Sequence, residues 1–289
     1  MKECYLYKKF PDKSVECQAC NHRCRISIGK RGICGIRENK LGKLNLLTFG
    51  LACAEQIDPV EKKPLYHFMP NTKTLTIATV GCNFTCKWCQ NWDISQSPKE
   101  DIIEGFNLPP EKIVEDALKN NCPSISYSYT EPTVYMDYAL DTMKLAHTKK
   151  IKNIWVSNGY MTKECLDMIS PYLDAANIDI KSLDSKKFSE YIGGINPDFV
   201  VDSCQYLIKK KIHLEITTLI IPFINDSPEE LTKIAQTIHD KLGASVPWHL
   251  SRYFPCYKYN EPATPVQTLE MAREIGKKIG LKNIHIGNV

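Results

Sequence analysis

The sequence predicts an α/β protein: a partial (β/α)6 barrel preceded by a cysteine-rich, metal-binding extension. From residue 72 onward, short β-branched and apolar runs alternate with longer stretches of helical spacing, which is typical of βαβ units and a parallel sheet. In addition, seven of the 13 cysteines fall in two tight clusters, one early in the chain and one just after the first strand of this alternation. We therefore expect an extension over residues 1–71 and a barrel core over residues 72–289.

The core contains six expected strand–helix units. The strands are expected at 74–80, 124–129, 153–157, 175–180, 212–221 and 246–251. The helices are expected at 109–120, 134–148, 162–173, 197–210, 227–242 and 266–279, and a short last strand follows. Six units are too few for a closed eight-stranded barrel, so a partial barrel is favoured, and a doubly wound open sheet is the alternative. In both architectures ligands bind at the carboxyl ends of the strands.

Composition narrows the class of protein. The net charge is only +4 and no block of five or six like charges occurs, so we do not expect a nucleic-acid partner. No apolar run approaches the roughly 18 residues of a membrane span, and the first ten residues carry charges throughout, which predicts a cytoplasmic protein without a membrane partner. Clustered cysteines, odd in number, in such a compartment favour metal binding over a disulfide framework.

The cluster after the first strand has the spacing Cys82-x3-Cys86-x2-Cys89. Thiolates hold iron–sulfur clusters, and three of them leave one iron of a four-iron cubane open to an outside ligand. Aromatic residues in the same loop are expected to shield the cluster from water: Phe84, Trp88 and Trp92. The alternatives are a zinc site with a distant fourth ligand and unligated core cysteines, but structural zinc sites normally use paired Cys-x2-Cys elements.

This motif, directly after the first strand, resembles the signature of the radical S-adenosylmethionine (radical SAM) superfamily. The resemblance implies a TIM-like partial barrel, a [4Fe–4S] cluster on Cys82, Cys86 and Cys89, and SAM as the ligand of the open iron. It also implies reductive cleavage of SAM to a 5′-deoxyadenosyl radical, which abstracts hydrogen from a substrate. An electron donor such as flavodoxin or ferredoxin is implied as well.

Two further loops are similar to SAM-binding elements of that superfamily. Tyr129-Thr130-Glu131-Pro132 resembles its Gly-Gly-Glu-Pro element, with the glycines replaced, and Glu131 is the expected partner of an ammonium group. Asn158 and Gly159 end the third strand and are expected near the ribose, although a left-handed turn explains this pair equally well.

The fourth and sixth strands supply the remaining expected site residues. Asp179 and Lys181 alternate with isoleucines, so they share a face, and charges inside a sheet are costly unless paired. The run resembles the Asp-Ile-Lys element of glycyl-radical-activating enzymes, which implies a catalytic and cofactor-binding role; a structural ion pair is the alternative. His249 and Arg252 are expected to contact the cofactor, with a core histidine as the alternative for His249.

The early cluster is Cys17-x2-Cys20-x3-Cys24-x9-Cys34. Four thiolates suffice for a closed zinc site or for a second iron–sulfur cluster, and a segment so poor in apolar residues hardly folds without a metal. Zinc, an auxiliary cluster and no metal all remain open, and Cys4 or His22 could replace one ligand.

The two clusters together with Tyr129–Pro132 resemble the AmmeMemoRadiSam system radical SAM enzymes, which are related to pyruvate formate-lyase activating enzymes. That resemblance implies partners from the Memo-like and AMMECR1-like families. The sequence thus predicts a radical SAM oxidoreductase acting on a protein or peptide. The alternatives are a glycyl-radical enzyme activase and a zinc-stabilised, non-enzymatic binding module.

Overall fold

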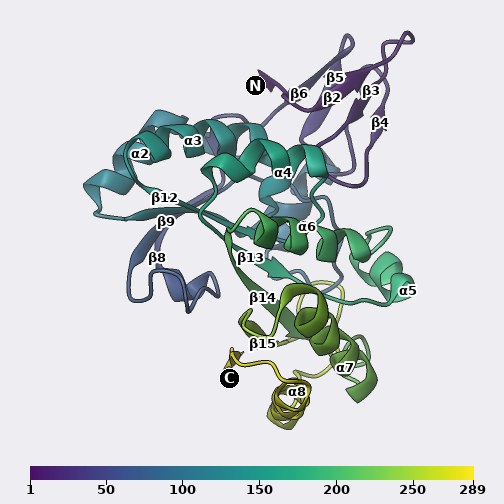
Figure 1. Ribbon diagram of the computed structural model, residues 1–289. Helices are drawn as coiled ribbons and strands as arrows, with labels where there is room; N and C mark the ends of the chain where they lie inside the picture. Colours follow the sequence, from purple (N-terminus) through teal and green to yellow (C-terminus); the bar gives the residue numbers. More distant parts are fainter.

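A central sheet of eight strands organises the chain, whose computed structural model describes residues 1–289 (Figure 1). Its spatial order is β16-β15-β14-β13-β12-β11-β9-β8. The strands span, in chain order, β8 Ala54–Pro59, β9 Lys73–Ala78, β11 Ser124–Tyr127, β12 Lys152–Ser157, β13 Ala175–Asp179, β14 His213–Ile220, β15 Trp248–Arg252 and β16 Ile284–Gly287. All are parallel except β8, which pairs with β9 in the antiparallel sense.

The strand order separates the two expected architectures. From β9 to β16 each strand lies beside its neighbour in sequence, and the order never reverses. A doubly wound sheet needs such a reversal, whereas a barrel winds in one direction. The fold is therefore the expected partial barrel, opened between β16 and the edge strand β8.

Helices cover one face of this sheet (Figure 1). They are α2 Pro110–Lys119, α3 Met136–Thr148, α4 Lys163–Ile169, α6 Asp198–Lys209, α7 Pro228–Thr237 and α8 Val266–Ile279. Side chains cap two of them: Thr162 accepts from the backbone amide of Cys165, and Ser227 from that of Glu230. The helix expected over 162–173 ends at Ile169, because Pro171 forces a 3-10 turn, and the helix expected over 227–242 ends in a π turn.

Two small antiparallel sheets form the extension: β1-β6-β5 and β2-β3-β4. Their strands are β1 Lys2–Glu3, β2 Tyr7–Lys9, β3 Val15–Cys17, β4 Arg25–Ile26, β5 Arg37–Lys40 and β6 Lys43–Leu46. Val15 and Ile26 belong to the same buried core as the barrel, and the Thr162 hydroxyl donates to the carbonyl of Gln18 over 2.6 Å. The extension thus shares its core with the barrel.

The sheet also begins earlier than the expected boundary between residues 71 and 72. Strand β8 lies in the segment assigned to the extension, yet it forms the antiparallel edge of the barrel sheet. The short elements β7 Leu51–Ala52 and β10 Phe106–Asn107 pair with each other. The short helices α1 Trp92–Gln96 and α5 Ser185–Lys187 follow β9 and β13 in the chain. None of the helices has the length and apolar character needed to span a membrane.

Candidate active site at the carboxyl ends of the barrel strands

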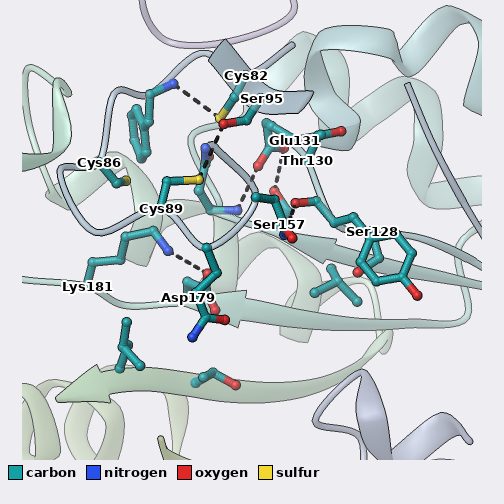
Figure 2. Close-up of a pocket in the computed structure, with 18 of the residues that line it drawn as sticks. Cys82, Cys86, Cys89, Ser95, Ser128, Thr130, Glu131, Ser157, Asp179 and Lys181 are labelled. Carbon is teal, nitrogen blue, oxygen red and sulfur yellow. Dashed lines mark hydrogen bonds and ion pairs between the residues drawn. The ribbon is translucent and has the colours of Figure 1, made fainter. Parts of the chain in front are cut away.

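A cavity of about 320 Å³ lies at the carboxyl ends of the barrel strands, and we call it the barrel cavity (Figure 2). This volume is at the lower end of the roughly 300–1,000 Å³ found for ligand pockets. Most of the residues expected at the site line it: Cys82, Cys86, Cys89, Glu131, Asn158, Asp179 and Lys181. Residues that lie up to 99 positions apart (82 to 181) are thus brought together, because parallel strands deliver their following loops to one edge.

The cysteine loop follows β9 and turns sharply at Gly81. This glycine has φ +105°, and a Cβ there would meet the side chain of Ile36 at 2.9 Å and the carbonyl oxygen of Cys34 at 3.1 Å. Only glycine fits such a conformation and such an approach. The loop that carries Cys82 is therefore seated directly against the extension.

The three thiols face the cavity together. The backbone amide of Phe84 donates to Cys82 Sγ over 3.4 Å, and Cys89 Sγ lies 3.3 Å from the Ser95 hydroxyl. Burial raises the pKa of Cys82 well above its usual range and that of Cys86 to about 12. Buried thiols of this kind ionise only with a cationic partner, which a metal centre supplies.

The three thiols are not grouped around a single metal ion, and their placement on one cavity is compatible with a cluster of several irons. Nowhere in the chain do three histidine, cysteine or acidic side chains come close enough to share one metal. A cubane cluster needs no such closeness, because each cysteine binds a different iron. The three cysteines line one cavity that continues beyond them, which leaves room for a ligand on a fourth iron.

Asp179 and Lys181 form an ion pair inside this cavity. Lys181 Nζ donates to Asp179 Oδ2 over 2.6 Å, and Figure 2 shows the pair near Cys86 and Cys89. Burial lowers the pKa of Lys181, but Asp179 and the Cys86 thiol outweigh it, and the pKa lies above its usual value. The ammonium group is therefore charged at neutral pH. The pair offers one positive and one negative group to a zwitterionic ligand.

Glu131 is buried at the end of β11, and the chain itself occupies its carboxylate. One oxygen accepts from the Thr133 amide and hydroxyl and from the Ser157 hydroxyl at 2.8 Å, and the other from the Asn158 amide at 2.8 Å. Burial raises the pKa of Glu131 in spite of these bonds. The residue ties the ends of β11 and β12 together at the cavity wall.

Asn158 and Gly159 differ in their placement. Asn158 lines the cavity, and its side-chain amide donates to Asn83 Oδ1 over 2.7 Å, so it also holds the cysteine loop. Gly159 does not line the cavity. Its φ is +71°, and a Cβ would meet Ile178 at 2.7 Å, so the left-handed turn and close packing account for this glycine.

The structure does not bring His249 or Arg252 to the barrel cavity. His249 Nε2 lies 2.6 Å from Glu215, one strand layer nearer the amino ends of the sheet. Glu215 also contacts His213 at 2.9 Å; burial opposes its ionisation, but these partners hold the pKa of Glu215 below its usual range. Arg252 Nε donates to the carbonyl of Thr264 over 2.8 Å. The core-histidine alternative therefore describes His249 better than cofactor contact.

Residues before β9 contribute a charged wall of the cavity that the sequence analysis did not predict. Lys63 is 1% exposed and donates to Asp58 over 2.7 Å, and the Tyr129 hydroxyl donates to the same carboxylate over 2.6 Å. Burial opposes ionisation of Asp58, but hydrogen bonds from Lys62, Lys63 and Tyr129 hold its pKa below the usual range. The missed signal is the pair Lys62-Lys63 ahead of Pro64. Antiparallel β8 ends beside Lys73, at the amino end of β9, and both lysines that follow it line the cavity.

Two of the three aromatic residues of the cysteine loop are placed as expected. Phe84 and Trp88 are buried and line the cavity. Trp92, by contrast, is 46% exposed and stacks on Tyr257, with ring centroids 5.3 Å apart. Trp92 therefore belongs to the outer rim and not to the shield around the cysteines.

The four early cysteines line a different, enclosed cavity, together with His22, Arg37 and Asn83. His22 points its Nε2 at the carbonyl oxygen of Asn83, 2.9 Å away, and Cys4 is not among the lining residues. The structure thus brings together the expected set Cys17, Cys20, Cys24 and Cys34, apart from the barrel cavity.

Sequence comparisons agree with this geometry. The profile described as the radical SAM superfamily matches residues 76–238. An uncharacterized protein of Methanocaldococcus jannaschii is 43% identical over all of this chain and 86% of the relative. A putative glycyl-radical enzyme activating enzyme of the same organism is 29% identical over 74% of this chain and 79% of the relative. The pyruvate formate-lyase-activating enzyme of Listeria monocytogenes is 24% identical over 67% of this chain and 82% of the relative.

Solved structures share the fold. SuiB of Streptococcus suis bound to S-adenosylmethionine matches with a TM-score of 0.58 at 17% identity, over 75% of this chain and 52% of that chain. The same enzyme bound to its precursor peptide SuiA matches with a TM-score of 0.55 at 18% identity, over 72% and 46%. This chain therefore spans about half the length of SuiB, and the likeness concerns the barrel fold.

Proposed function

This chain belongs to the radical SAM superfamily, and we propose that it cleaves S-adenosylmethionine reductively to a 5′-deoxyadenosyl radical that removes hydrogen from a protein or peptide. Members of the superfamily bind a [4Fe–4S] cluster and SAM, and these are the cofactors of this enzyme. The observation that carries the proposal is the convergence of Cys82, Cys86 and Cys89 on an open cavity at the carboxyl ends of the strands.

When bound, the cluster supplies one electron to the sulfonium of SAM, and cleavage yields methionine and the 5′-deoxyadenosyl radical. The chain's own residues hold and orient the groups around it. Cys82, Cys86 and Cys89 would bind three irons, and the buried rings of Phe84 and Trp88 exclude water from the same cavity.

The Asp179–Lys181 pair gives the cavity its polarity. The Asp179 carboxylate can accept from an ammonium group, and Lys181 can donate to a carboxylate, so together they match the amino-acid end of SAM. Glu131 positions the Asn158 loop through the Ser157 hydroxyl and the Asn158 amide, and its Oε2 accepts from that amide alone, so it can also accept from an ammonium group. We therefore assign Asp179 and Lys181 to the ligand, and Glu131 to the cavity wall with one oxygen open to the same ligand.

The size of the cavity supports a large substrate that enters from outside. About 320 Å³ is the scale of one cofactor-sized ligand, so little space remains for a second molecule once SAM is bound. Exposed aromatic side chains follow β9, β14 and β15 at the carboxyl edge of the sheet: Trp92, Phe223 and Phe254; half-buried Tyr257 stacks on Trp92. Aromatic residues are enriched at protein interfaces, which favours a protein or peptide that inserts one residue.

A second candidate is activation of a glycyl-radical enzyme, which the relatives named as activating enzymes favour. This reaction leaves a stable radical on a glycine of the partner protein. An EPR doublet from that radical would identify an activase, whereas a closed-shell modified product would identify a modifying enzyme. The Memo-like and AMMECR1-like partners, and flavodoxin or ferredoxin as electron donor, stay predictions. A zinc-stabilised binding module no longer fits a member of this superfamily.

The test begins with the anaerobically purified, iron- and sulfide-reconstituted chain. We expect the EPR signal of the dithionite-reduced protein to change on addition of SAM, and 5′-deoxyadenosine to form. To assign the substrate class, host extract from cells grown on deuterated amino acids would be divided into macromolecules and small molecules. Deuterium in 5′-deoxyadenosine with the macromolecular fraction supports a protein or peptide substrate; deuterium only with the small-molecule fraction overturns it.

A further inference from the structure

The four early cysteines meet in one enclosed space, which we call the N-terminal cysteine cavity. They come from the end of β3, the loop before β4 and the loop before β5, and no disulfide joins them. Three of them are less than a tenth exposed: Cys17, Cys20 and Cys34. Four thiols that face a common interior are the ligand set of a closed metal centre.

The spacing of these thiols distinguishes between the possible metal centres. Tetrahedral zinc, with Zn–S bonds of about 2.3 Å, brings its four sulfurs to within about 3.8 Å of one another. No three metal-binding side chains in the chain are grouped closely enough for a single ion. The cysteines of the barrel cavity are not grouped for a single ion either, and they are the set that holds a [4Fe–4S] cluster. The N-terminal set, like the barrel set, is thus not placed around a single ion, and four thiols on one cavity can instead each bind a different iron.

Two unpaired N–H groups lie at the same cavity. Arg37 and Asn83 line it and are 2% and 1% exposed, and the Nη1 of Arg37 and the Nδ2 of Asn83 have no hydrogen-bond partner. Burying such donors without a partner costs about 1–3 kcal/mol each. A sulfur-rich anionic centre would accept from both. The charge of Arg37 is already paired with buried Asp137, so its free Nη1 would contribute a hydrogen bond and not an uncompensated charge.

The cavity itself is small, with about 10 Å³ of free volume. That is room for about one water molecule. The cavity therefore excludes solvent and ligands, in contrast to the barrel cavity. A four-iron core is larger than this space, so the four thiols must rotate outward to bind it.

We propose that this chain binds a second [4Fe–4S] cluster, held entirely by protein thiolates: Cys17, Cys20, Cys24 and Cys34. Because all four irons have a cysteine ligand, this cluster has no open iron and does not bind SAM. Its existence goes beyond the proposed reaction and does not depend on it.

The second site adjoins the first through the cysteine loop. Asn83 follows Cys82 in sequence, lines the N-terminal cysteine cavity with its side chain, and accepts from His22 at its carbonyl oxygen. Gly81 packs against the carbonyl of Cys34. One segment, residues 81–83, thus forms a wall of both cavities, and the proposed cluster is placed beside the SAM-cleaving one.

The test counts iron, sulfide and zinc in a variant that has lost the barrel cluster. The full chain carrying Cys82→Ser, Cys86→Ser and Cys89→Ser would be expressed with both iron and zinc in the medium and purified without oxygen. We expect about half of the wild-type iron and acid-labile sulfide to remain, with the Mössbauer signature of a [4Fe–4S] cluster. Cys204→Ala, a buried cysteine that lines neither cavity, is the matched control and should retain the full content.

Residual zinc without iron or sulfide in the triple variant would overturn the proposal, as would the absence of any metal in a folded protein. If the triple variant does not fold, Cys24→Ser provides the reciprocal measurement, because Cys24 is the least buried ligand. Half of the iron should then be lost while the SAM-dependent EPR change of the barrel cluster persists. Full iron content in folded Cys24→Ser would contradict a second cluster. Failure of the proposed SAM cleavage is a separate result, since it appears in the wild-type assay whatever the iron count.

Discussion

The two cysteine sites use the same thiol chemistry in opposite surroundings. The barrel site has three cysteines and a cavity of about 320 Å³ that is also lined by the charged side chains of Asp179, Lys181 and Lys63. The N-terminal site has four cysteines and a closed space of about 10 Å³. The difference shows how the number of protein ligands and the access to the metal centre separate a reactive site from a closed one.

The extension supports the cysteine loop of the barrel site through packing, without contributing a residue to the proposed chemistry. Its sheets share one buried core with the barrel, and the carbonyl of Cys34 packs against Gly81 of the barrel's cysteine loop. A metal centre in the extension would stabilise the surface on which that loop rests. Substituting one cysteine of each site should therefore separate the two sites: a cysteine of the barrel site should affect activity, and a cysteine of the N-terminal site should affect stability.

The largest effect is expected from Cys86→Ala, which removes a ligand of the open site. Production of 5′-deoxyadenosine should fall to background, and about half of the iron should be lost, while the melting temperature changes little. Chromatography, iron analysis and calorimetry measure the three. Cys204→Ala should behave as wild type. Retained SAM cleavage in Cys86→Ala would refute the assignment of the barrel site.

Cys34→Ala is the counterpart at the closed site. Loss of a structural metal belongs to the mutations that cost about 4 kcal/mol or more of unfolding free energy. We expect a large drop in the melting temperature, with SAM cleavage per folded chain largely kept when dithionite supplies the electron. An unchanged melting temperature would mean that the closed site holds no stabilising metal.

Asp58→Asn tests the buried Asp58–Lys63 ion pair beside the barrel cavity. The change leaves Lys63 buried without its partner and should cost about 3 kcal/mol at pH 7. The pKa of Asp58 in the folded protein lies below its usual value of 3.8. The carboxylate therefore contributes fully to the free energy of unfolding above about pH 5, and this contribution is lost as the pH falls from 3.8 toward the lower pKa of the folded state. Denaturant unfolding of both proteins should therefore show a difference that shrinks below about pH 4.

A pH-independent difference between wild type and Asp58→Asn would assign the effect to packing and not to charge. The control is Asp167→Asn, which breaks a surface pair with Lys163. Exposed pairs contribute about 1 kcal/mol or less, so this variant should differ little from wild type at any pH.

The smallest effect is expected from Lys181→Met, which keeps the length of the side chain and removes its charge. A hydrogen bond to a charged group contributes about 1.5–3 kcal/mol, so SAM binding should weaken about 10- to 100-fold with the iron content unchanged. Equilibrium binding of SAM to the anaerobic protein and iron analysis measure the two. Lys163→Met on the surface is the control. Loss of iron in Lys181→Met would make Lys181 a structural residue of the cluster loop.

Local sequence patterns determined the elements and the ligands. Apolar β-branched runs placed β9 and β11 to β15 to within about two residues, because a buried parallel strand is continuously apolar. Prolines and caps such as Ser227 marked the helix starts, and the Cys-x3-Cys-x2-Cys spacing carried the resemblance to the radical SAM superfamily, which implies a [4Fe–4S] cluster on these three cysteines. Membership of the superfamily and its cofactors followed from those few residues.

Other features depended on contacts between distant segments. Strand β8 and the Asp58–Lys63 wall come from a segment that reads as part of the extension, and only antiparallel pairing with β9 carries them to the cavity. His249 lies two residues before Ser251 on β15, so both side chains point to the same face of the sheet. Ser251 lines the cavity, whereas His249 lies nearer the amino end of the strand and contacts Glu215 on β14.

The sequence by itself determined which residues are chemically able to act: clustered thiols, a spaced Asp–Lys pair, and strands that end in polar loops. Tertiary structure decided which of them face the same space. It placed four early cysteines around a closed cavity and three later ones around an open one, with Asn83 between them. The physical reason is that spacing along the chain limits only near neighbours, whereas access, burial and charge partners are set by segments that meet after folding.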